Sequence, residues 1–187
     1  SDCNPLAASK GINRIVIGEG ATSQGDNTAV IGNSDLTKLY VAEDGQGVLY
    51  ADASINSSDQ RIKENIADID YGLEYLMSLR PVSYDRKSPS DYPQELKDKF
   101  YPNGTVPDEL PPHLKRRQLG FIAQEVQATN EAFAVENPIV VIDNDGFHRM
   151  DYVKLIVPLV RATQEVYEEV RTSHQMINKQ QVQIDRQ

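Results

Sequence analysis

Two residues able to do covalent chemistry stand close together in residues 57–66, which read Ser-Ser-Asp-Gln-Arg-Ile-Lys-Glu-Asn-Ile. A serine hydroxyl becomes a nucleophile when a base removes its proton, and a lysine amine is such a base when burial disfavours its charged form. Ser58 and Lys63 are five residues apart, a spacing that a turn or a short helix closes. The same segment also fits an ordinary helix start with Ser58 or Asp59 as its N-cap. Spacing alone leaves both interpretations open.

Composition narrows the classes of function. The chain has 187 residues, 39% of them hydrophobic, which suffices for the core of one ordinary domain with attachments. Its 19 basic and 28 acidic residues give a net charge of −9, which argues against a nucleic-acid-binding protein because such proteins contact phosphate through cations. No apolar run approaches the ~18 residues of a membrane span. The first residue is Ser1 and no signal-like stretch follows it, so we expect a piece of a longer protein.

Metal and cofactor chemistry are not expected. The single cysteine, Cys3, excludes an internal disulfide and a cysteine-rich zinc site. The three histidines, His113, His148 and His174, are scattered along the chain. Such scatter argues against a metal site, which needs its ligands gathered.

A repeat marks the N-terminal part of the chain. Residues 15–18 (Ile-Val-Ile-Gly) and 29–32 (Ala-Val-Ile-Gly) are offset by 14 positions. Such spacing predicts short strands, each ended by a sharp corner and stacked on the next. Two repeats cannot bury a core alone, so the stack must continue upstream or close against other chains. The alternative is a pair of unrelated hairpin strands. The repeat also resembles the head repeats of trimeric bacterial surface adhesins. A further hairpin is predicted for residues 39–41 and 48–50.

The middle of the chain predicts a small mixed domain. Asp70 is placed to cap a helix that ends at Leu79 before a proline. Residues 82–84 predict a strand, and residues 87–116 show no period and predict a long proline-rich loop. The expected apolar face of the helix consists of Leu73, Leu76 and Met77.

A second hairpin is predicted for residues 139–142 and 147–150 around the turn Asp-Asn-Asp-Gly at 143–146. The acidic turn is not an EF-hand calcium loop, because the twelfth position counted from Asp143 is Lys154 instead of glutamate.

Residues 156–184 show the clearest periodicity. Apolar and small residues follow one another at alternating spacings of three and four, the heptad pattern of a coiled coil. Pro158 suits the first turn of the helix. Polar residues surround the seam beyond Thr172, which favours association between chains over packing on the chain's own domain. The seam consists of Ile156, Leu159, Thr163, Val166, Val170, Ser173, Ile177, Gln180 and Ile184. The pattern alone does not fix the number of chains.

Four segments in order resemble one family of domains. Residues 58–66 (Ser-Asp-x-Arg-x-Lys-x-x-Ile) resemble the opening of the C-terminal intramolecular chaperones of phage tail spikes, tail fibres and endosialidases. The same domain occurs in self-cleaving myelin regulatory factors. Residues 79–84 resemble the family's L-x-P-V-x-Y strand entry, residues 120–126 its G-x-I-A-Q-E-V segment, and residues 152–162 its Y-x-x-L-x-P-x-L-x-x-A helix entry. The resemblance covers about residues 58–187.

This resemblance implies a chaperone that trimerises the chain, templates the folding of the fibre before it and then cuts itself off. It implies cleavage between Ser57 and Ser58, with Ser58 as the nucleophile and Lys63 as the general base. Asp59 and Arg61 match the motif, and a structural cap and a salt-bridge partner are their simplest interpretations.

The family glutamine corresponds to Gln124, which we expect to pack or to bond the backbone without taking part in the chemistry. Many family members carry a histidine two residues before the glycine of the third segment, where this chain has Gln118. His113 would need realignment to take that place, so Lys63 has to carry the base role.

These expectations combine into an α+β homotrimer with three parts. Residues 1–57 would be the end of a trimeric β-fibre stem, residues 58–157 an α+β chaperone and autoprotease domain, and residues 158–187 a C-terminal coiled coil. The expected partners are further copies of the chain and the upstream fibre, without nucleic acid or a membrane span. The expected location is a virion tail fibre or spike assembled in the bacterial cytoplasm, from which the cleaved chaperone is released.

The sequence leaves two other classes of function open. One is a non-catalytic trimeric fibre or adhesin stalk terminus, since the repeat and the heptads do not depend on the serine. The other is a serine hydrolase acting on external substrates, which the absence of a G-x-S-x-G or Ser-x-x-Lys motif disfavours.

Overall fold

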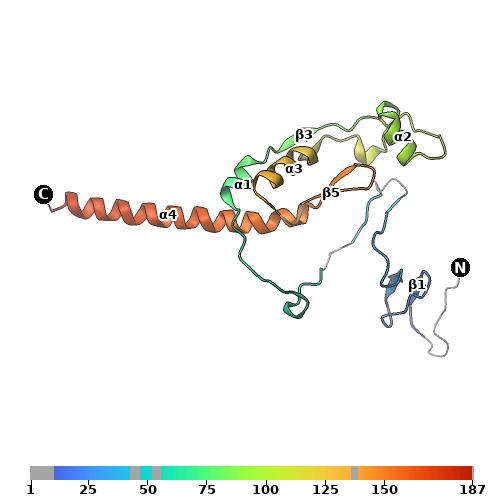
Figure 1. Ribbon diagram of the computed structural model, residues 1–187, viewed down its shortest axis with the longest axis horizontal. Helices are drawn as coiled ribbons and strands as arrows, with labels where there is room; N and C mark the ends of the chain where they lie inside the picture. Colours follow the sequence, from blue (N-terminus) through green and yellow to red (C-terminus); the bar gives the residue numbers. More distant parts are fainter. Residues whose placement is uncertain (1–10, 43–46, 52–55, 136–138, 187) are drawn as a thin grey trace. The chain divides into compact units, whose positions relative to one another are not determined.

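Figure 1 shows the computed structural model of the chain, which describes residues 11–42, 47–51, 56–135 and 139–186. The chain forms two compact units, residues 1–54 with 95–105 and residues 55–94 with 106–187. The described residues contain both α-helices and short two-stranded sheets, which confirms the mixed α+β class.

The first unit contains the predicted repeat as a parallel strand pair. Strands β1 (Ile15–Ile17) and β2 (Ala29–Ile31) pair with Ile15 opposite Ala29 and Ile17 opposite Ile31. The register equals the 14-residue offset of the sequence. The stacked interpretation is therefore confirmed, and the hairpin alternative is wrong because hairpin strands run antiparallel.

The corners of the two repeats also have matching backbone conformations. Asn13 and Asn27 both have positive φ, and Asn13 Nδ2 donates to Asn27 Oδ1 at 3.4 Å. Gly18 and Gly32 end the strands with positive φ, and a Cβ on Gly18 would lie 3.1 Å from the Gly32 Cα. Successive corners thus stack closely, which requires glycine at this position.

The hairpin predicted for residues 39–41 and 48–50 does not form strands among the described residues. Residues 39–41 and 48–50 have no ladder partners there. The Gly47 amide still donates to the Val41 carbonyl oxygen at 2.9 Å. Residues 43–46 lie outside the described residues.

The core of the second unit is built from two short helices, a hairpin and the start of a long helix. These elements are α1 (Leu73–Ser78), α3 (Ala123–Ala132), β5 (Val140–Ile142), β6 (His148–Met150) and α4 (Ile156–Ile184). Helix α1 packs on α4, and α3 packs on both hairpin strands. The most deeply buried cluster consists of Tyr75, Val126, Ile139 and Val140.

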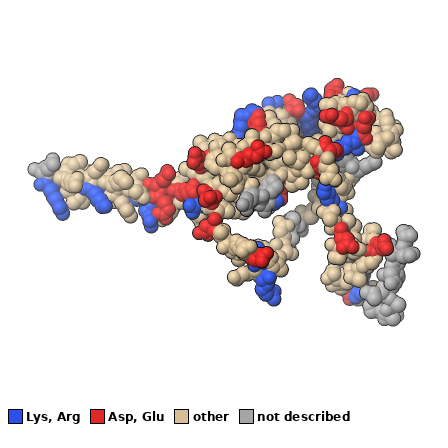
Figure 2. All heavy atoms as spheres, viewed as in Figure 1, with Lys and Arg blue, Asp and Glu red and all other residues tan. Residues whose placement is uncertain are grey.

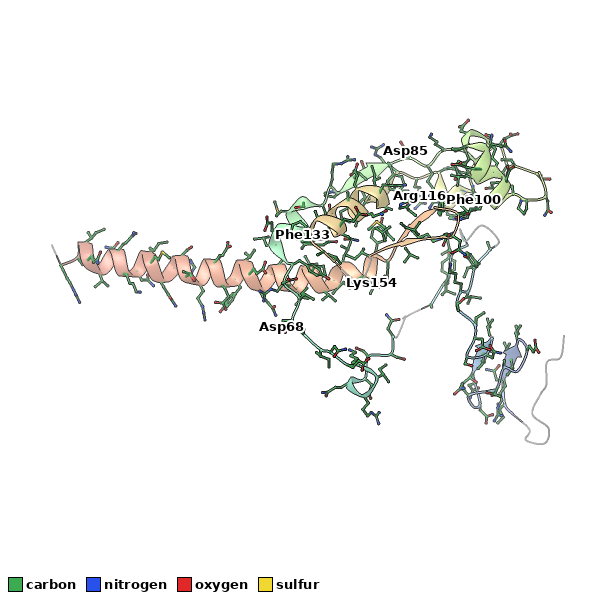
Figure 3. All side chains as sticks on the ribbon, in the orientation of Figure 1. Asp68, Asp85, Phe100, Arg116, Phe133 and Lys154 are labelled. Carbon is green, nitrogen blue, oxygen red and sulfur yellow. The ribbon has the colours of Figure 1, made fainter. Side chains whose placement is uncertain are left out.

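Tyr75 lies at the centre of this cluster and is fully buried. Its ring meets Phe133 edge-on, with centroids 5.5 Å apart, and its hydroxyl donates to Asn130 Oδ1 at 2.8 Å. Phe133 is labelled in Figure 3. Burial, reinforced by the neighbouring Tyr71, raises the pKa of Tyr75 to about 12. The buried polar pair satisfies itself, so the tyrosine fills the core without an unpaired hydroxyl.

Helix α1 begins later than predicted, and Asp70 does not cap it. Gly72 is the N-cap residue, and the Leu73 amide instead donates to Glu165 Oε2 of α4 at 2.7 Å. The expected apolar face was also partly wrong, because Met77 is 77% exposed while Tyr75 turns inward.

The strand predicted at residues 82–84 is confirmed as β3 (Val82–Tyr84), which pairs antiparallel with β4 (Gln118–Gly120). The region 87–116 is not a structureless loop. It contains α2 (Gln94–Phe100) and two single 3-10 turns. A helix of seven residues between prolines is too short to produce a recognisable period.

The predicted hairpin around residues 143–146 is confirmed by β5 and β6, with Val140 opposite Met150. Gly146 has φ +81° in the turn. Asp143 Oδ2 accepts from Arg149 Nε at 3.0 Å, so this carboxylate holds the hairpin together.

The long helix predicted from the heptads is confirmed as α4, but the coiled coil and the trimer remain predictions. Pro158 and Ala162 are its buried residues. The seam residues are all exposed in the single chain, and the exposed fractions of the aliphatic ones range from 42% for Val166 to 63% for Ile184. Figure 2 shows acidic side chains gathered on α4 near the core and basic ones farther along it, with uncharged surface between them.

Candidate functional site

A single 3-10 turn, η1 (Gln60–Ile62), organises the segment that carries Ser58 and Lys63. Asp59 precedes the turn in extended conformation, and its Oδ1 accepts from the Arg61 amide at 2.8 Å. The Lys63 amide donates to the Gln60 carbonyl oxygen at 3.0 Å and closes the turn. The cap interpretation is therefore confirmed for Asp59.

The same turn brings the two candidate catalytic side chains together. Lys63 Nζ lies 2.7 Å from Ser58 Oγ, within hydrogen-bond distance. A separation of this length suits an ammonium donating to the hydroxyl oxygen, and it equally suits a hydroxyl donating to a neutral amine. The pair therefore has the geometry that proton transfer between nucleophile and base requires.

A second side-chain pair lies inside the same loop. Arg61 Nε donates to Asp59 Oδ1 at 2.9 Å and Nη2 donates to Oδ2 at 2.8 Å. This two-pronged hydrogen bond and the capped amide lower the pKa of the Asp59 carboxyl, and the same ion pair raises the pKa of Arg61. The salt-bridge interpretation of these two motif residues is thus confirmed.

The two side chains of the pair are not buried within the single chain, and their burial in an assembled trimer stays a prediction. Ser57, Ser58 and Lys63 are all exposed. A neutral lysine amine needs a less aqueous environment than an open surface supplies. Such an environment would have to come from outside the single chain's described contacts.

Two further motif segments meet at the surface of the second unit. Segment 79–84 supplies β3 and segment 120–126 begins at the end of β4, so strand pairing joins them. Arg80 of the first donates to Glu125 of the second, with Nε 3.0 Å from Oε2. This contact lowers the pKa of Glu125 and raises that of Arg80.

The fourth segment joins the same place through Tyr152. Its hydroxyl oxygen accepts from the Phe121 amide at 3.3 Å. A Cβ on Gly120 would lie only 2.5 Å from that oxygen, so the glycine leaves room for the tyrosine. The motif positions around Gly120 therefore serve packing between β4, α3 and the entry to α4.

Other candidate residues have no place in this geometry. Gln124 is exposed on the first turn of α3 in the single chain, so its expected packing or backbone bond stays a prediction. Gln118 Nε2 donates to the Arg116 carbonyl oxygen at 2.7 Å. His113 lies in a 3-10 turn, His148 Nε2 lies 2.8 Å from Gln127 Oε1, and His174 is exposed on α4.

Sequence reasoning missed Glu165 and the Arg80–Glu125 pair. Arg80 and Glu125 both fall within recognised motif segments and carry opposite charges, which was a usable signal. Glu165 gave none, because it acts on a residue 92 positions away.

Comparison with known protein families finds a likeness for the middle of the chain. A family described as the chaperone of endosialidase matches residues 58–134. This part of the chain is therefore similar to that family. The match begins at Ser58 and includes η1, the β3–β4 pair and α3. No curated protein matches the chain.

The parts of the chain that the structure describes contain neither a membrane helix nor a metal cluster. Among these residues no helix is long and apolar enough to cross a bilayer. Within the same described ranges, no three histidine, cysteine or acidic side chains gather where they could hold an ion.

Proposed function

We propose that the chain is the C-terminal intramolecular chaperone of a phage tail fibre or spike, which assembles as a homotrimer and templates the folding of the fibre before it. It then cleaves its own backbone between Ser57 and Ser58. The family match supports the chaperone role and a phage tail protein, and the family's classification as a peptidase supports self-cleavage. The observation that carries the catalytic part is the 2.7 Å separation of Ser58 Oγ and Lys63 Nζ.

The proposed reaction is an acyl shift followed by hydrolysis. Lys63, as a neutral amine, takes the proton of the Ser58 hydroxyl while Oγ attacks the carbonyl carbon of Ser57. The carbon–nitrogen bond then breaks, and the proton passes to the departing amino group of Ser58. Water attacks the resulting ester, which returns the hydroxyl to Ser58 and leaves a carboxylate on Ser57. Serine is regenerated, but each chain has a single bond to cut.

Assembly is the proposed source of the environment that the base needs. Both side chains of the dyad are exposed in the single chain. A neighbouring copy that covers them would favour the neutral amine and exclude water until the acyl shift has occurred. Cleavage would then follow assembly and report that it is complete.

The exposed seam of α4 supports self-association. A regular row of aliphatic side chains along a 29-residue helix is the pattern that coiled coils bury. Val170, in the middle of the row, is 48% exposed although its neighbours at spacings of three and four are also aliphatic or small. Three such helices would align three chain ends in register.

The stacked repeat is the part of the chain that would need this alignment in order to fold with its copies. Strands β1 and β2 pair in parallel, and their isoleucines remain about half exposed in the single chain. Contacts between chains require that association entropy be lost before they form. A coiled coil raises the local concentration of the three stems, commonly into the mM range for short connections. Removal of the chaperone afterwards would leave the fibre kinetically trapped.

Denaturing mass spectrometry of the purified wild-type chain tests the proposal. We expect two fragments, residues 1–57 and 58–187. Their formal charges differ, at 3 − 7 = −4 and 16 − 21 = −5. Intact chains from folded, assembled protein would contradict self-cleavage and favour the non-catalytic fibre terminus.

Three variants separate the chemistry from the folding. Ser58→Ala removes the nucleophile, and Lys63→Met removes the base. Lys63→Arg keeps a cation of similar reach that does not lose its proton in proteins. All three are expected to stay intact and to form the same oligomer as wild type. If Lys63→Arg cleaves at the wild-type rate, Lys63 is not the base.

A further inference from the structure

The dyad depends on a turn that the core of the protein does not hold. Every residue from 56 to 68 is exposed. The turn η1 has three residues and two backbone hydrogen bonds. The Ile62 amide donates to the Asp59 carbonyl oxygen at 3.2 Å, and the Lys63 amide donates to the Gln60 carbonyl oxygen at 3.0 Å. A 3-10 turn of this length gains little from its own hydrogen bonds, because fixing the backbone costs more than one or two such bonds return. Something else must keep Ser58 and Lys63 together.

Asp59 and Arg61 provide three additional bonds across this turn. Both carboxylate oxygens of Asp59 are engaged by the guanidinium, and one of them also caps the Arg61 amide. Two parallel N–H···O bonds between planar groups fix their mutual orientation as well as their distance. The pair therefore restrains the backbone between residues 59 and 61.

The position of this pair in the chain matters for the dyad. Asp59 directly follows Ser58, and Arg61 precedes Lys63 by two residues. A restraint on Asp59 and Arg61 consequently acts on both ends of the loop that carries the nucleophile and the base. The Asp59 carboxylate accepts all three of these hydrogen bonds from Arg61, so it restrains this residue.

We propose that Asp59 and Arg61 are positioning residues for self-cleavage, and that their ion pair and cap hold the loop in the form that keeps Lys63 Nζ against Ser58 Oγ. This inference rests on the proposed function of the dyad. Neither residue exchanges a proton with Ser58. Because exposed ion pairs contribute little to global stability, their removal should slow cleavage without loosening the folded protein. Misplacement of a reacting group by about 1 Å can cost ~100-fold in rate.

The test measures the cleavage rate of assembled protein after the precursor is trapped at low pH and the pH is raised. Asp59→Asn keeps an oxygen for the amide cap but loses the ion pair, and Arg61→Gln loses the same ion pair from the other side. We expect each to slow cleavage about 10-fold, and Asp59→Ala, which also loses the cap, about 100-fold. The decisive variant is the double substitution Asp59→Asn with Arg61→Gln. It should be as slow as either single one, because both remove one shared contact.

Two controls exclude a merely structural explanation. Arg61→Lys keeps the positive charge but cannot make the two parallel hydrogen bonds of the guanidinium. It should recover part of the rate lost in Arg61→Gln. Glu64→Gln removes a neighbouring carboxylate that takes part in neither contact and should cleave at the wild-type rate. The oligomer mass and the thermal midpoint of all variants should match those of the Ser58→Ala protein. The pH midpoint of the rate should also stay unchanged in the double variant, because it removes one negative and one positive charge together and leaves the base the same.

The outcomes distinguish this inference from the function beneath it. An uncut wild type, or cleavage that survives Ser58→Ala, overturns both. Dyad-dependent cleavage with wild-type rates in Asp59→Asn and Arg61→Gln overturns the positioning role alone. So does a double variant whose slowing is the product of the two single effects, since that would mean the residues act separately. A shifted pH midpoint in the double variant would also overturn it, because the ion pair would then act on the protonation of the base instead of on its position.

Discussion

Glu165 ties the long helix α4 to the start of α1, and its removal should weaken the fold measurably. Its Oε2 accepts from the Leu73 amide at 2.7 Å, and its Oε1 accepts from Arg161 Nε at 2.8 Å. The carboxylate lies so near Gly72 that a Cβ there would be 2.6 Å from Oε2. We therefore consider the substitution Glu165→Ala, made in the Ser58→Ala protein so that every chain stays whole.

The expected loss has two parts. The first amide of α1 loses its cap, and the loss of a side-chain cap typically costs about 0.5–2 kcal/mol. The pair with Arg161, four residues earlier on α4, adds about 0.3–0.5 kcal/mol. The sum is about 1–2.5 kcal/mol in the free energy of unfolding. Glu165→Gln keeps an accepting oxygen but loses the charge, so it should fall near the lower end of that range.

Urea unfolding followed by circular dichroism at one fixed protein concentration measures this difference. The matched control is Glu168→Ala, which breaks an exposed pair with Arg171 on the same helix, at 2.7 Å, and should cost less than about 0.5 kcal/mol. If Glu165→Ala and Glu168→Ala unfold at the same urea concentration, the cap contributes nothing and this reasoning is refuted.

Three further predictions concern packing, assembly and pH. Gly120→Ala should lower the free energy of unfolding, measured in urea, by about 1–3 kcal/mol because its Cβ would meet the Tyr152 hydroxyl. Adding Tyr152→Phe removes that hydroxyl and should restore part of the loss. Equal unfolding midpoints for the single and double variants would contradict the clash. Val170→Asp should abolish the oligomer seen in sedimentation, and the cleavage with it. Gln175→Asp, on the opposite side of α4, should leave both intact. If the Val170→Asp protein still forms the oligomer, the chains do not associate through the seam. Because the folded-state pKa of Tyr75 is raised to about 12, its contribution to stability is complete below about pH 10 and is lost as the pH rises toward 12, by up to about 2–3 kcal/mol. Tyr75→Phe should flatten this part of the stability curve, and an unchanged curve would show that another group titrates.

Parts of the fold specified by local signals were predictable. The offset of 14 between two Val-Ile-Gly runs gave the register of β1 and β2, because stacked repeats place equivalent residues opposite each other. The Asp-Gly turn gave the β5–β6 hairpin, since glycine readily adopts the positive φ found at Gly146. The heptads gave α4 to within its observed ends.

Features that depend on distant residues were not predictable. The sequence predicts Asp70 as the cap of α1, but the helix starts at Leu73, whose amide donates to the Glu165 carboxylate of α4. Met77 was expected inside because a helical period counted from Leu73 includes it. The short helix instead turns Tyr75 inward, where Asn130 satisfies its hydroxyl.

The candidate site shows the same division. The approach of Ser58 to Lys63 could be anticipated, because five residues with a capping aspartate between them form a local turn. The two-pronged contact of Asp59 with Arg61 was foreseen only as one of several roles for motif residues. The burial of Lys63 is expected in the assembled trimer and stays a prediction, since none of the described residues of the single chain buries this side chain.

The geometry of α4 connects assembly to this exposed site. Successive residues on a helix turn by about 100°, so Leu159 of the seam and Ala162, buried toward the core, lie only about 60° apart. The face that would coil and the face that carries the chaperone core are therefore neighbours on one helix, and α1 packs beside the seam. Lys63 precedes the first residue of α1 by ten positions, which span at most about 35 Å when extended. Coiling of three α4 helices would consequently confine three dyads near the common axis, where each can be covered by a neighbouring chain. A Ser–Lys pair that is ordered locally but left uncovered by its own chain is what a cleavage reaction controlled by assembly requires.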